Sequence, residues 1–211
     1  MFQRLSRRCF AAAYDTINGP AERAGLREQR RSLLARATGA TIEIGAGTGL
    51  NLSHFPATVT RLVLVEPDPD MRRRLRAHAR KLGRDAEILD ASVERLPFPD
   101  ASFDTAVVTF ALCSVPDEPT ALAEIARVLT PGGKLLFLEH VRSTDPRISA
   151  KQDRRPFPYP QIGCHPNRAT LDAIEASPFT VDSVVHGEVP KVPQVESPMI
   201  VGMARRPVLT G

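Results

Sequence analysis

Three alternating glycines follow a short apolar run in which an acidic residue, Glu43, stands just before the break. The segment is TIEIGAGTG at residues 41–49, and this pattern predicts a buried strand that opens into a glycine-rich turn. Glycine lets the backbone turn tightly and approach a ligand with no Cβ in the way. The dinucleotide fingerprint G-x-G-x-x-G would need its third glycine at position 50, which is Leu50. The spacing E-x-G-x-G-x-G therefore favours a nucleotide-like ligand other than a dinucleotide.

Acidic and hydroxyl side chains follow each of the first three expected strands. Glu43 could accept a hydrogen bond from an ammonium group of the ligand or order the turn. Glu66 ends the second strand, where an acid suits the two hydroxyls of a ribose; its alternative is a solvent-facing strand end. Asp90 and Ser92 follow the third strand, and either could accept from the amino group of an adenine. The alternative for residues 90–94 is a turn that only caps a helix.

Alternating strands and helices must position these residues. Apolar runs of strand length alternate with charged helical segments, which predicts a mostly parallel sheet wound on both faces. In such a sheet ligands bind beyond the carboxyl ends of the strands, near the point where the strand order reverses. The expected strands are residues 40–44, 62–65, 86–89, 105–110, 134–138, 180–185 and 199–204. The expected helices are residues 25–37, 50–54, 70–82, 119–129 and 168–176, with TPGG at 130–133 as a stop signal.

Composition limits the class of protein. The 211 residues suit a single α/β domain, residues 1–211, with a sizeable core. No apolar run reaches the roughly 18–20 residues that span a bilayer, so we expect a cytoplasmic protein without integral membrane association. The cysteines Cys9, Cys113 and Cys164 are odd in number and far apart in sequence, which predicts free thiols in a reducing compartment. The net charge of +4 tolerates an anionic partner without requiring one.

Two segments flank the expected sheet. The first fourteen residues are basic, contain no acid and are weakly amphipathic. We expect residues 1–38 to form a lid helix that closes over the ligand, with a membrane-surface helix as the alternative. Residues 142–166 hold five prolines and few apolar runs, which predicts an irregular cap over the substrate.

Several motifs resemble one enzyme superfamily. The E-x-G-x-G-x-G turn resembles motif I of the class I S-adenosylmethionine (AdoMet)-dependent methyltransferases. DASFD at 100–104, PGG at 131–133 and LLFLEHV at 135–141 resemble the fourth-strand and fifth-strand regions of the same superfamily. The resemblance covers about residues 10–204. It implies a Rossmann-like α/β fold: a seven-stranded, mostly parallel sheet with helices on both faces and an antiparallel last strand.

Four stretches resemble a narrower group within that superfamily. GTGLN with HFP after it at 47–56, ALCSV at 111–115, LEHV at 138–141 and GCHPNR at 163–168 are similar to the methyltransferase-like seven type. Its characterised members methylate alkyl thiols, and quinone-biosynthesis C-methyltransferases are more distantly similar. The chain departs from these relatives at residues 92–93, where Ser-Val replaces the Asp-Ala pair of many of them. It also has no tryptophan in the insert, where the relatives lead us to expect some.

The resemblance implies a site for AdoMet and a site for the methyl acceptor. The cofactor-binding residues would be Glu43, Gly45, Ala46, Gly47, Gly49, Asn51, Glu66, Pro67, Asp90, Ala91, Ser92, Phe110 and Leu112. The acceptor would meet Tyr14, Cys113, Phe157, Tyr159 and Arg168, with Phe10 completing an apolar rim. Cys113 is expected to be a small residue lining the pocket. Arg168 could bind an anionic group or cap neighbouring loop carbonyls.

Methyl transfer from a sulfonium makes modest demands on the protein. The reaction depends chiefly on positioning and on exclusion of water, and a base is needed only if the nucleophile arrives protonated. His140 and His165 are the candidate bases, because neutral imidazole accepts a proton near pH 7. A thiol acceptor ionises readily, so the alternative is that no protein base acts. The cysteines form no C-x-x-C pair, so we expect no metal.

The sequence thus predicts an AdoMet-dependent methyltransferase that acts on a small, fairly apolar acceptor, with a thiol favoured by resemblance. The basic run in residues 72–81 raises the alternative of an RNA or protein substrate. On a helix these residues spread around the cylinder, so we expect a solvated face and no nucleic-acid partner. A non-catalytic AdoMet-binding protein is the remaining alternative.

Overall fold

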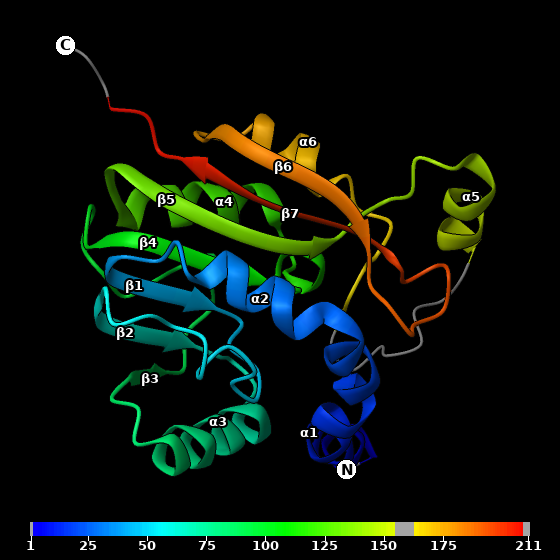
Figure 1. Cartoon of the computed structure of the whole chain (residues 1–211), viewed down its shortest axis with the longest axis horizontal. Helices are drawn as coiled ribbons and strands as arrows, with labels where there is room; N and C mark the ends of the chain where they lie inside the picture. Colours follow the sequence, from blue (N-terminus) through cyan, green and yellow to red (C-terminus); the bar gives the residue numbers. More distant parts are fainter. Residues whose placement is uncertain (1, 155–162, 209–211) are drawn as a thin grey trace.

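A single seven-stranded sheet forms the centre of the computed structural model, which describes residues 2–154 and 163–208 (Figure 1). The strand order is β3-β2-β1-β4-β5-β7-β6. Strand β7 pairs antiparallel with β5 and β6, and the other neighbours pair in parallel. The expected class I fold, with its antiparallel last strand, is confirmed. The strands are β1 Gly39–Ile44, β2 Val59–Val65, β3 Glu87–Leu89, β4 Phe103–Thr109, β5 Leu129–His140, β6 Thr180–Glu188 and β7 Pro198–Arg205.

The strand order reverses between β1 and β4. From β1 the chain proceeds through β2 to β3 on one side, and β4 then begins the other half of the sheet. Ile44 at the end of β1 lies opposite both Val65 of β2 and Val108 of β4, so the carboxyl ends of the three strands are level. The residues that follow these ends are therefore neighbours at the position where open α/β sheets bind ligands.

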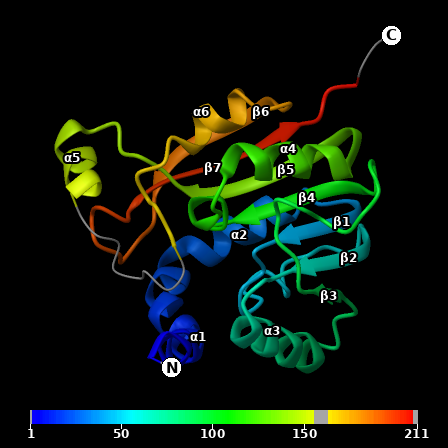
Figure 2. The ribbon, with the colours of Figure 1, turned by 180° about the vertical axis from the view of Figure 1, so that it is seen from behind.

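Helices cover both faces of the sheet, as the two opposite views show (Figures 1 and 2). One face packs Ile42 and Val108 against Leu122 of α4 and Ile174 of α6. The other face packs its side chains against α2 and α3, with Leu75 of α3 fully buried. The helices are α1 Phe2–Ala21, α2 Arg27–Leu34, α3 Pro69–Leu82, α4 Glu118–Val128, α5 Pro146–Arg154 and α6 Thr170–Glu175.

Helix α3 begins and ends where its sequence predicts. The Asp68 carboxylate accepts hydrogen bonds from the backbone N–H groups of Asp70 and Met71, and proline occupies the first helical position at Pro69. Gly83 ends the helix with a φ of +60°, a left-handed conformation that favours glycine. This capping fixes the start of α3 beside the end of β2.

Three segments differ from expectation. Residues 50–54 form turns and no helix, with bonds from Leu52 N–H to Gly49 O and from His54 N–H to Asn51 O. Asn51 turns its side chain into the interior there and bonds to Glu43. Helix α4 ends at Val128, just before the TPGG stop signal as expected, but residues 130–133 belong to β5, where they bulge between pairs made by Leu129 and Lys134. The predicted irregular insert contains helix α5.

The N-terminal segment lies across the carboxyl end of the sheet. Helices α1 and α2 are joined by a π-helix, Glu22–Leu26, in which Gly25 has a φ of +130°. In Figure 1 α1 lies beside α3, below the strand ends. Among the described residues, no helix is both long enough and apolar enough to cross a lipid bilayer.

Candidate AdoMet and acceptor site

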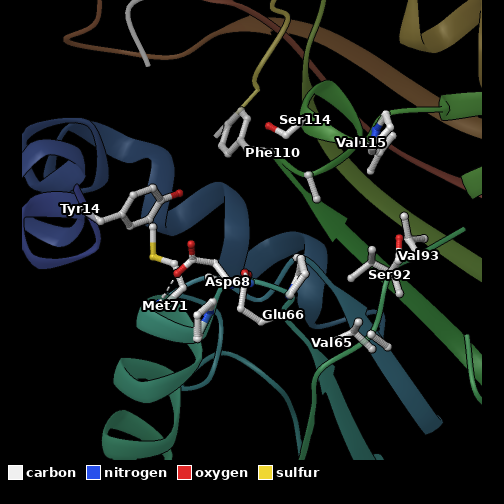
Figure 3. Close-up of a pocket in the computed structure, with 18 of the residues that line it drawn as sticks. Tyr14, Val65, Glu66, Asp68, Met71, Ser92, Val93, Phe110, Ser114 and Val115 are labelled. Carbon is white, nitrogen blue, oxygen red and sulfur yellow. Dashed lines mark hydrogen bonds between the residues drawn. The ribbon is translucent and has the colours of Figure 1, made fainter. Parts of the chain in front are cut away.

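A cavity of about 390 Å³ lies at the carboxyl ends of β1, β2 and β4. Its walls come from α1, from the turns after the three strands, and from the short 3-10 helix η2, Leu112–Ser114. Figure 3 shows Tyr14 of α1, Glu66 after β2 and Ser92 after β3 around this cavity. The size falls in the range of small-molecule sites, and the lining is largely apolar with a few polar groups.

The glycine turn between β1 and residue 50 has the conformation that only glycine adopts without strain. Gly45 has a φ of +66°, and a Cβ there would lie 2.7 Å from the Cβ of Ala111. Gly49 has a φ of +91°, and its Cβ would lie 2.6 Å from Leu52 Cδ1. Both distances exclude a side chain. The turn therefore brings backbone, with no side chain in the way, to the edge of the cavity.

Glu66 links the glycine turn to the start of α3. Its carboxylate accepts from Gly47 N–H and from Asp68 N–H, each at 2.8 Å. Burial raises the pKa of Glu66, and these two backbone donors oppose that rise. The side chain is only 7% exposed, and it lines the cavity. Each carboxylate oxygen has a further lone pair for a ligand hydroxyl, as the ribose expectation requires.

The two candidates for an adenine contact are placed differently. The Asp90 carboxylate pairs with Arg72 Nη2 at 2.6 Å and does not line the cavity. Ser92 lines it, together with Ala91 and Val93. Arg72 also donates to the backbone oxygen of Glu66 at 2.5 Å and is buried. The first arginine of the basic run is therefore an internal support of the site and does not belong to a solvated face.

A buried polar network lies beneath the glycine turn. Asn51 Nδ2 donates to Glu43 at 2.7 Å and to Thr109 at 2.9 Å. Arg30 donates to Asn51 at 3.1 Å and to Glu22 at 2.9 Å. Burial raises the pKa of Glu43 to about 7. Glu43 is absent from the lining of the main cavity, but it lines a smaller cavity that shares Gly45 and Gly47 with it. Its Oε2 is buried and has no hydrogen-bond partner among the described residues, so both roles expected for Glu43 stay open.

Sequence reasoning missed Arg30 and Thr109 in this network. Arg30 shares a buried face of α2 with Leu33 and Leu34, at the spacing of core positions. A buried arginine needs carboxylate and amide partners, which Glu22 and Asn51 provide. The spacing of Arg30 from the buried leucines was the signal available in the sequence, but several arginines in the same region have a helical spacing from these leucines.

Helix α1 is fastened over the glycine turn. Asp15 Oδ1 accepts from Thr48 Oγ1 at 2.5 Å, and Phe10 packs with Tyr14 and Met71 in a small apolar cluster. Burial raises the pKa of Tyr14 to about 12, so its phenol stays protonated at neutral pH. Tyr14 and Phe10 line the cavity as expected for the acceptor rim. Asp15 was not anticipated from the sequence.

The wall after β4 alternates between lining and buried residues. Phe110, Ala111, Ser114 and Val115 line the cavity. Leu112 and Cys113, which were expected to contact cofactor and acceptor, are fully buried on the opposite side of η2 and are absent from the lining. A 3-10 turn places successive residues on different sides, and the apolar sequence does not show which side faces the ligand.

Arg168 supports the same wall from outside. Its guanidinium donates to the backbone oxygens of Leu112 and Val115 at 2.6 and 2.7 Å. Of the two roles expected for Arg168, it therefore has the capping one, and it is absent from the cavity lining. The remaining predicted acceptor residues, Phe157 and Tyr159, lie outside the described residues.

Neither candidate base lines the cavity. The ring centroid of His140 lies 4.4 Å from that of Phe110, and burial lowers the pKa of His140 to about 4. His165 is exposed, and its backbone N–H donates to Cys113 O at 2.7 Å. His140 is therefore neutral at pH 7 and contacts Phe110, which itself lines the cavity. Within residues 2–154 and 163–208 no three His, Cys, Asp or Glu side chains are grouped to hold a metal ion.

Comparisons with known proteins agree with this geometry. Residues 42–137 match the family model described as "Methyltransferase domain". The ubiquinone/menaquinone biosynthesis C-methyltransferase UbiE of Hahella chejuensis is 35% identical over 68% of the chain, and the alignment spans 61% of UbiE. The human thiol S-methyltransferase TMT1A is 29% identical over 77% of the chain and 69% of its own length.

A solved structure extends the comparison to the fold. The SAM-dependent methyltransferase of Thermotoga maritima, described as a possible histamine N-methyltransferase, superposes with a TM-score of 0.68. The superposition covers 95% of the chain and 98% of that protein at 23% identity. At this identity the likeness concerns the fold. The match to UbiE covers less than two thirds of that relative.

Proposed function

The chain belongs to the class I AdoMet-dependent methyltransferases, and we propose that it transfers the methyl group of AdoMet to a small, largely apolar acceptor, with a thiol as the favoured nucleophile. The observation that carries the proposal is the position of Glu66. Its carboxylate joins the glycine turn to the start of α3 while it lines the cavity.

The residues at the strand ends fit AdoMet. Glu66 would bind the ribose hydroxyls, residues 91–93 would contact the adenine, and the backbone of residues 45–47 would lie along the methionine portion. Phe110, at the end of β4, has a φ of +55° and would close that portion on the other side. When bound, AdoMet supplies a methyl group already activated by its sulfonium. The protein's task is then orientation and exclusion of water.

The acceptor side supports a small and uncharged partner. Phe10, Tyr14, Val115 and Pro116 present mostly carbon to the cavity. The acids that line it, Glu66 and Asp68, accept backbone N–H groups at the cofactor end. TMT1A is named a thiol S-methyltransferase and UbiE a C-methyltransferase of quinone biosynthesis. Both names are compatible with an acceptor of this kind, and a thiol is the one that the sequence motifs favour.

Deprotonation of the acceptor is proposed to need no protein base. No histidine lines the cavity among the described residues, and Tyr14, with its pKa of about 12, cannot accept a proton at neutral pH. A thiol ionises far more readily than an alcohol, with cysteine at a pKa of about 8.5, so a small fraction of thiolate is available near pH 8 without a protein base. Tyr14 can donate a hydrogen bond to that thiolate and orient it. Free thiols in the protein itself also suit the reducing cytoplasm that we propose as its location.

The proposal is tested in two steps. Isothermal titration with AdoMet and, separately, with NAD measures whether the cavity selects the cofactor that the glycine spacing favours. Methyl transfer from labelled AdoMet is then measured with two matched pairs of acceptors: an alkyl thiol with the corresponding alcohol, and a phenol with the corresponding hydroquinone.

We expect AdoMet to bind and NAD not to bind, and the thiol to be methylated at least tenfold faster than the alcohol. Preferential turnover of the hydroquinone, with the label found on a ring carbon of the product, would replace sulfur by carbon as the acceptor atom. AdoMet binding without turnover across the panel would favour a non-catalytic AdoMet-binding protein. Failure to bind AdoMet would refute the function altogether.

A further inference from the structure

Two buried cysteines from distant parts of the chain meet behind the wall of the cavity. The Sγ atoms of Cys113 and Cys164 lie 3.1 Å apart, although the residues are separated by 51 positions. This distance is about 1 Å longer than the roughly 2.05 Å of a disulfide bond. Both cysteines are free thiols. The three cysteines are far apart in the sequence, but the fold brings Cys113 and Cys164 together.

We propose that Cys113 and Cys164 form a reversible dithiol–disulfide site that small-molecule disulfides oxidise. The inference does not depend on the acceptor of the methyl group. It assigns a chemical role to a pair of side chains that the proposed methyl transfer does not use.

Neighbouring contacts already hold the two cysteines in position. The backbone N–H of His165 donates to Cys113 O at 2.7 Å. Arg168, further along the same segment, donates to the oxygens of Leu112 and Val115 on either side of Cys113. Residues 163–168 are therefore docked on η2 through three hydrogen bonds around the sulfur pair. Because the backbone is fixed on both sides, closing the bond requires only a small approach of the sulfurs.

The η2 segment is also held from the interior. The Glu139 carboxylate accepts from the backbone N–H groups of Ala111, Leu112 and Cys113 at 2.8, 3.1 and 3.4 Å. Ala111 and Ser114 line the cavity. A disulfide at Cys113 would thus covalently fasten the cavity wall to residues 163–168, which now hold it by hydrogen bonds alone. Oxidation would make this wall more rigid.

The exchange proceeds in two balanced steps. Cys164 is 5% exposed and Cys113 is 0% exposed, so an entering disulfide RSSR meets Cys164 first. The Cys164 thiolate attacks one sulfur, the S–S bond breaks, and RS⁻ leaves a mixed disulfide behind. Cys113 then loses its proton and attacks Cys164 Sγ, displacing the second RS⁻. Two protein thiols are oxidised to one disulfide, and RSSR is reduced to two thiols once the leaving groups are protonated.

The pH dependence of the exchange follows from the surroundings of Cys113. Its hydrogen bond with Cys164, and then burial, raises the pKa of the Cys113 thiol above its ordinary value. Besides Cys164, the titratable or polar groups that interact with it are Glu139 beneath it, Ser114 beside it and Tyr14 of α1. The thiolate of Cys113 is therefore scarce at neutral pH, and the second step should accelerate as pH rises.

The experiment uses the full chain with Cys9→Ser, which removes the exposed third thiol and leaves the pair intact. The protein is incubated with excess 2-hydroxyethyl disulfide at pH 8, and free thiols, intact mass and melting temperature are measured. We expect both thiols to disappear together, with a mass loss of two hydrogen atoms and no retained adduct. The melting temperature should rise by roughly 5–10 °C and return on reduction.

The matched control is Cys9→Ser with Cys164→Ser, which should show neither the mass loss nor the shift in melting temperature. Hydrogen exchange of residues 111–116 should slow in the oxidised protein, which tests the rigid wall directly. The proposal is overturned if a mixed disulfide persists on one cysteine, or if both thiols stay reduced under conditions that oxidise a small dithiol. None of these readouts uses methyl transfer, so a failed acceptor screen leaves them unaffected.

Discussion

Replacing Glu66 by Gln isolates the contribution of one carboxylate to cofactor binding. The carboxylate accepts from Gly47 N–H and Asp68 N–H, and the amide can accept at only one of these positions. At the other position, an N–H of the side chain faces an N–H of the backbone. The shape of the side chain is conserved, so the cavity keeps its volume while its acceptor capacity falls.

The magnitude follows from the contacts. A hydrogen bond to a charged acceptor contributes about 1.5–3 kcal/mol, and the proposed ribose contacts draw on the same two oxygens. A net loss of about 2–3 kcal/mol in cofactor binding corresponds to roughly a 30- to 150-fold increase in the Kd for AdoMet. Isothermal titration measures the Kd, and the melting temperature of the free protein shows whether the fold is retained.

The matched control is Glu87→Gln on the neighbouring strand β3. Glu87 pairs with Arg61 at 2.9 Å, and both side chains are about half exposed, so the ion pair contributes little. We expect its Kd for AdoMet to stay within about twofold of the unaltered protein. An unchanged Kd in folded Glu66→Gln would refute the assignment of Glu66 to the ribose. Should Glu66→Gln fail to fold, Glu66→Asp keeps the charge, shortens its reach and is expected to weaken binding about tenfold.

Four further variants test other parts of the site. Gly47→Val should weaken AdoMet binding by at least about 100-fold in titration, because Gly47 has a φ of +57° and valine would be strained beside the cofactor; retained affinity would remove the glycine turn from the site. His140→Gln and His165→Ala should each keep AdoMet affinity and turnover within about threefold of the unaltered protein, because neither ring lines the cavity. A loss of turnover of about 100-fold or more in one of these variants would identify that histidine as the base. Glu43→Gln tests the raised pKa of about 7 of Glu43. The folded state keeps a proton that an unfolded glutamate loses near pH 4.3, so the unfolding free energy falls as pH rises between about 4.5 and 7.5. Between pH 5 and pH 8, the unfolding free energy measured in urea titrations should fall by about 1–3 kcal/mol less in Glu43→Gln than in the unaltered protein. An equal fall in both proteins would contradict the burial of an ionisable Glu43.

The cofactor side of the site was largely predictable from the sequence. Glu66 and the glycines lie at strand ends, and the period of the strands together with the glycine spacing fixes where those ends fall. Helix α3 was predicted over residues 70–82, and the structure adds only Pro69 at its start, after the Asp68 cap. One error is residues 50–54, which form turns in place of the expected helix, with Asn51 directed inward to Glu43.

The second wall of the cavity was less predictable, because its contacts join segments that are distant in sequence. Leu112 and Cys113 look like their lining neighbours in composition, and only the 3-10 geometry of η2 separates the buried from the exposed side. Arg168 was left with two roles, and the structure gives it the carbonyl-capping one through bonds to Leu112 and Val115. No local pattern encodes a contact across more than fifty residues.

The different construction of the two ends of the cavity has a consequence for acceptor specificity. The proposed cofactor end is built from backbone and from Glu66, at the ends of parallel strands whose register the sheet fixes. The proposed acceptor end is built from α1 and η2, which are held by separable contacts: Asp15 with Thr48, and Arg168 with the carbonyl of Leu112. Changes in these outer contacts can reshape the acceptor space without disturbing the strand ends. The same fold can therefore keep one cofactor while its relatives act on acceptors as different as thiols and quinone precursors.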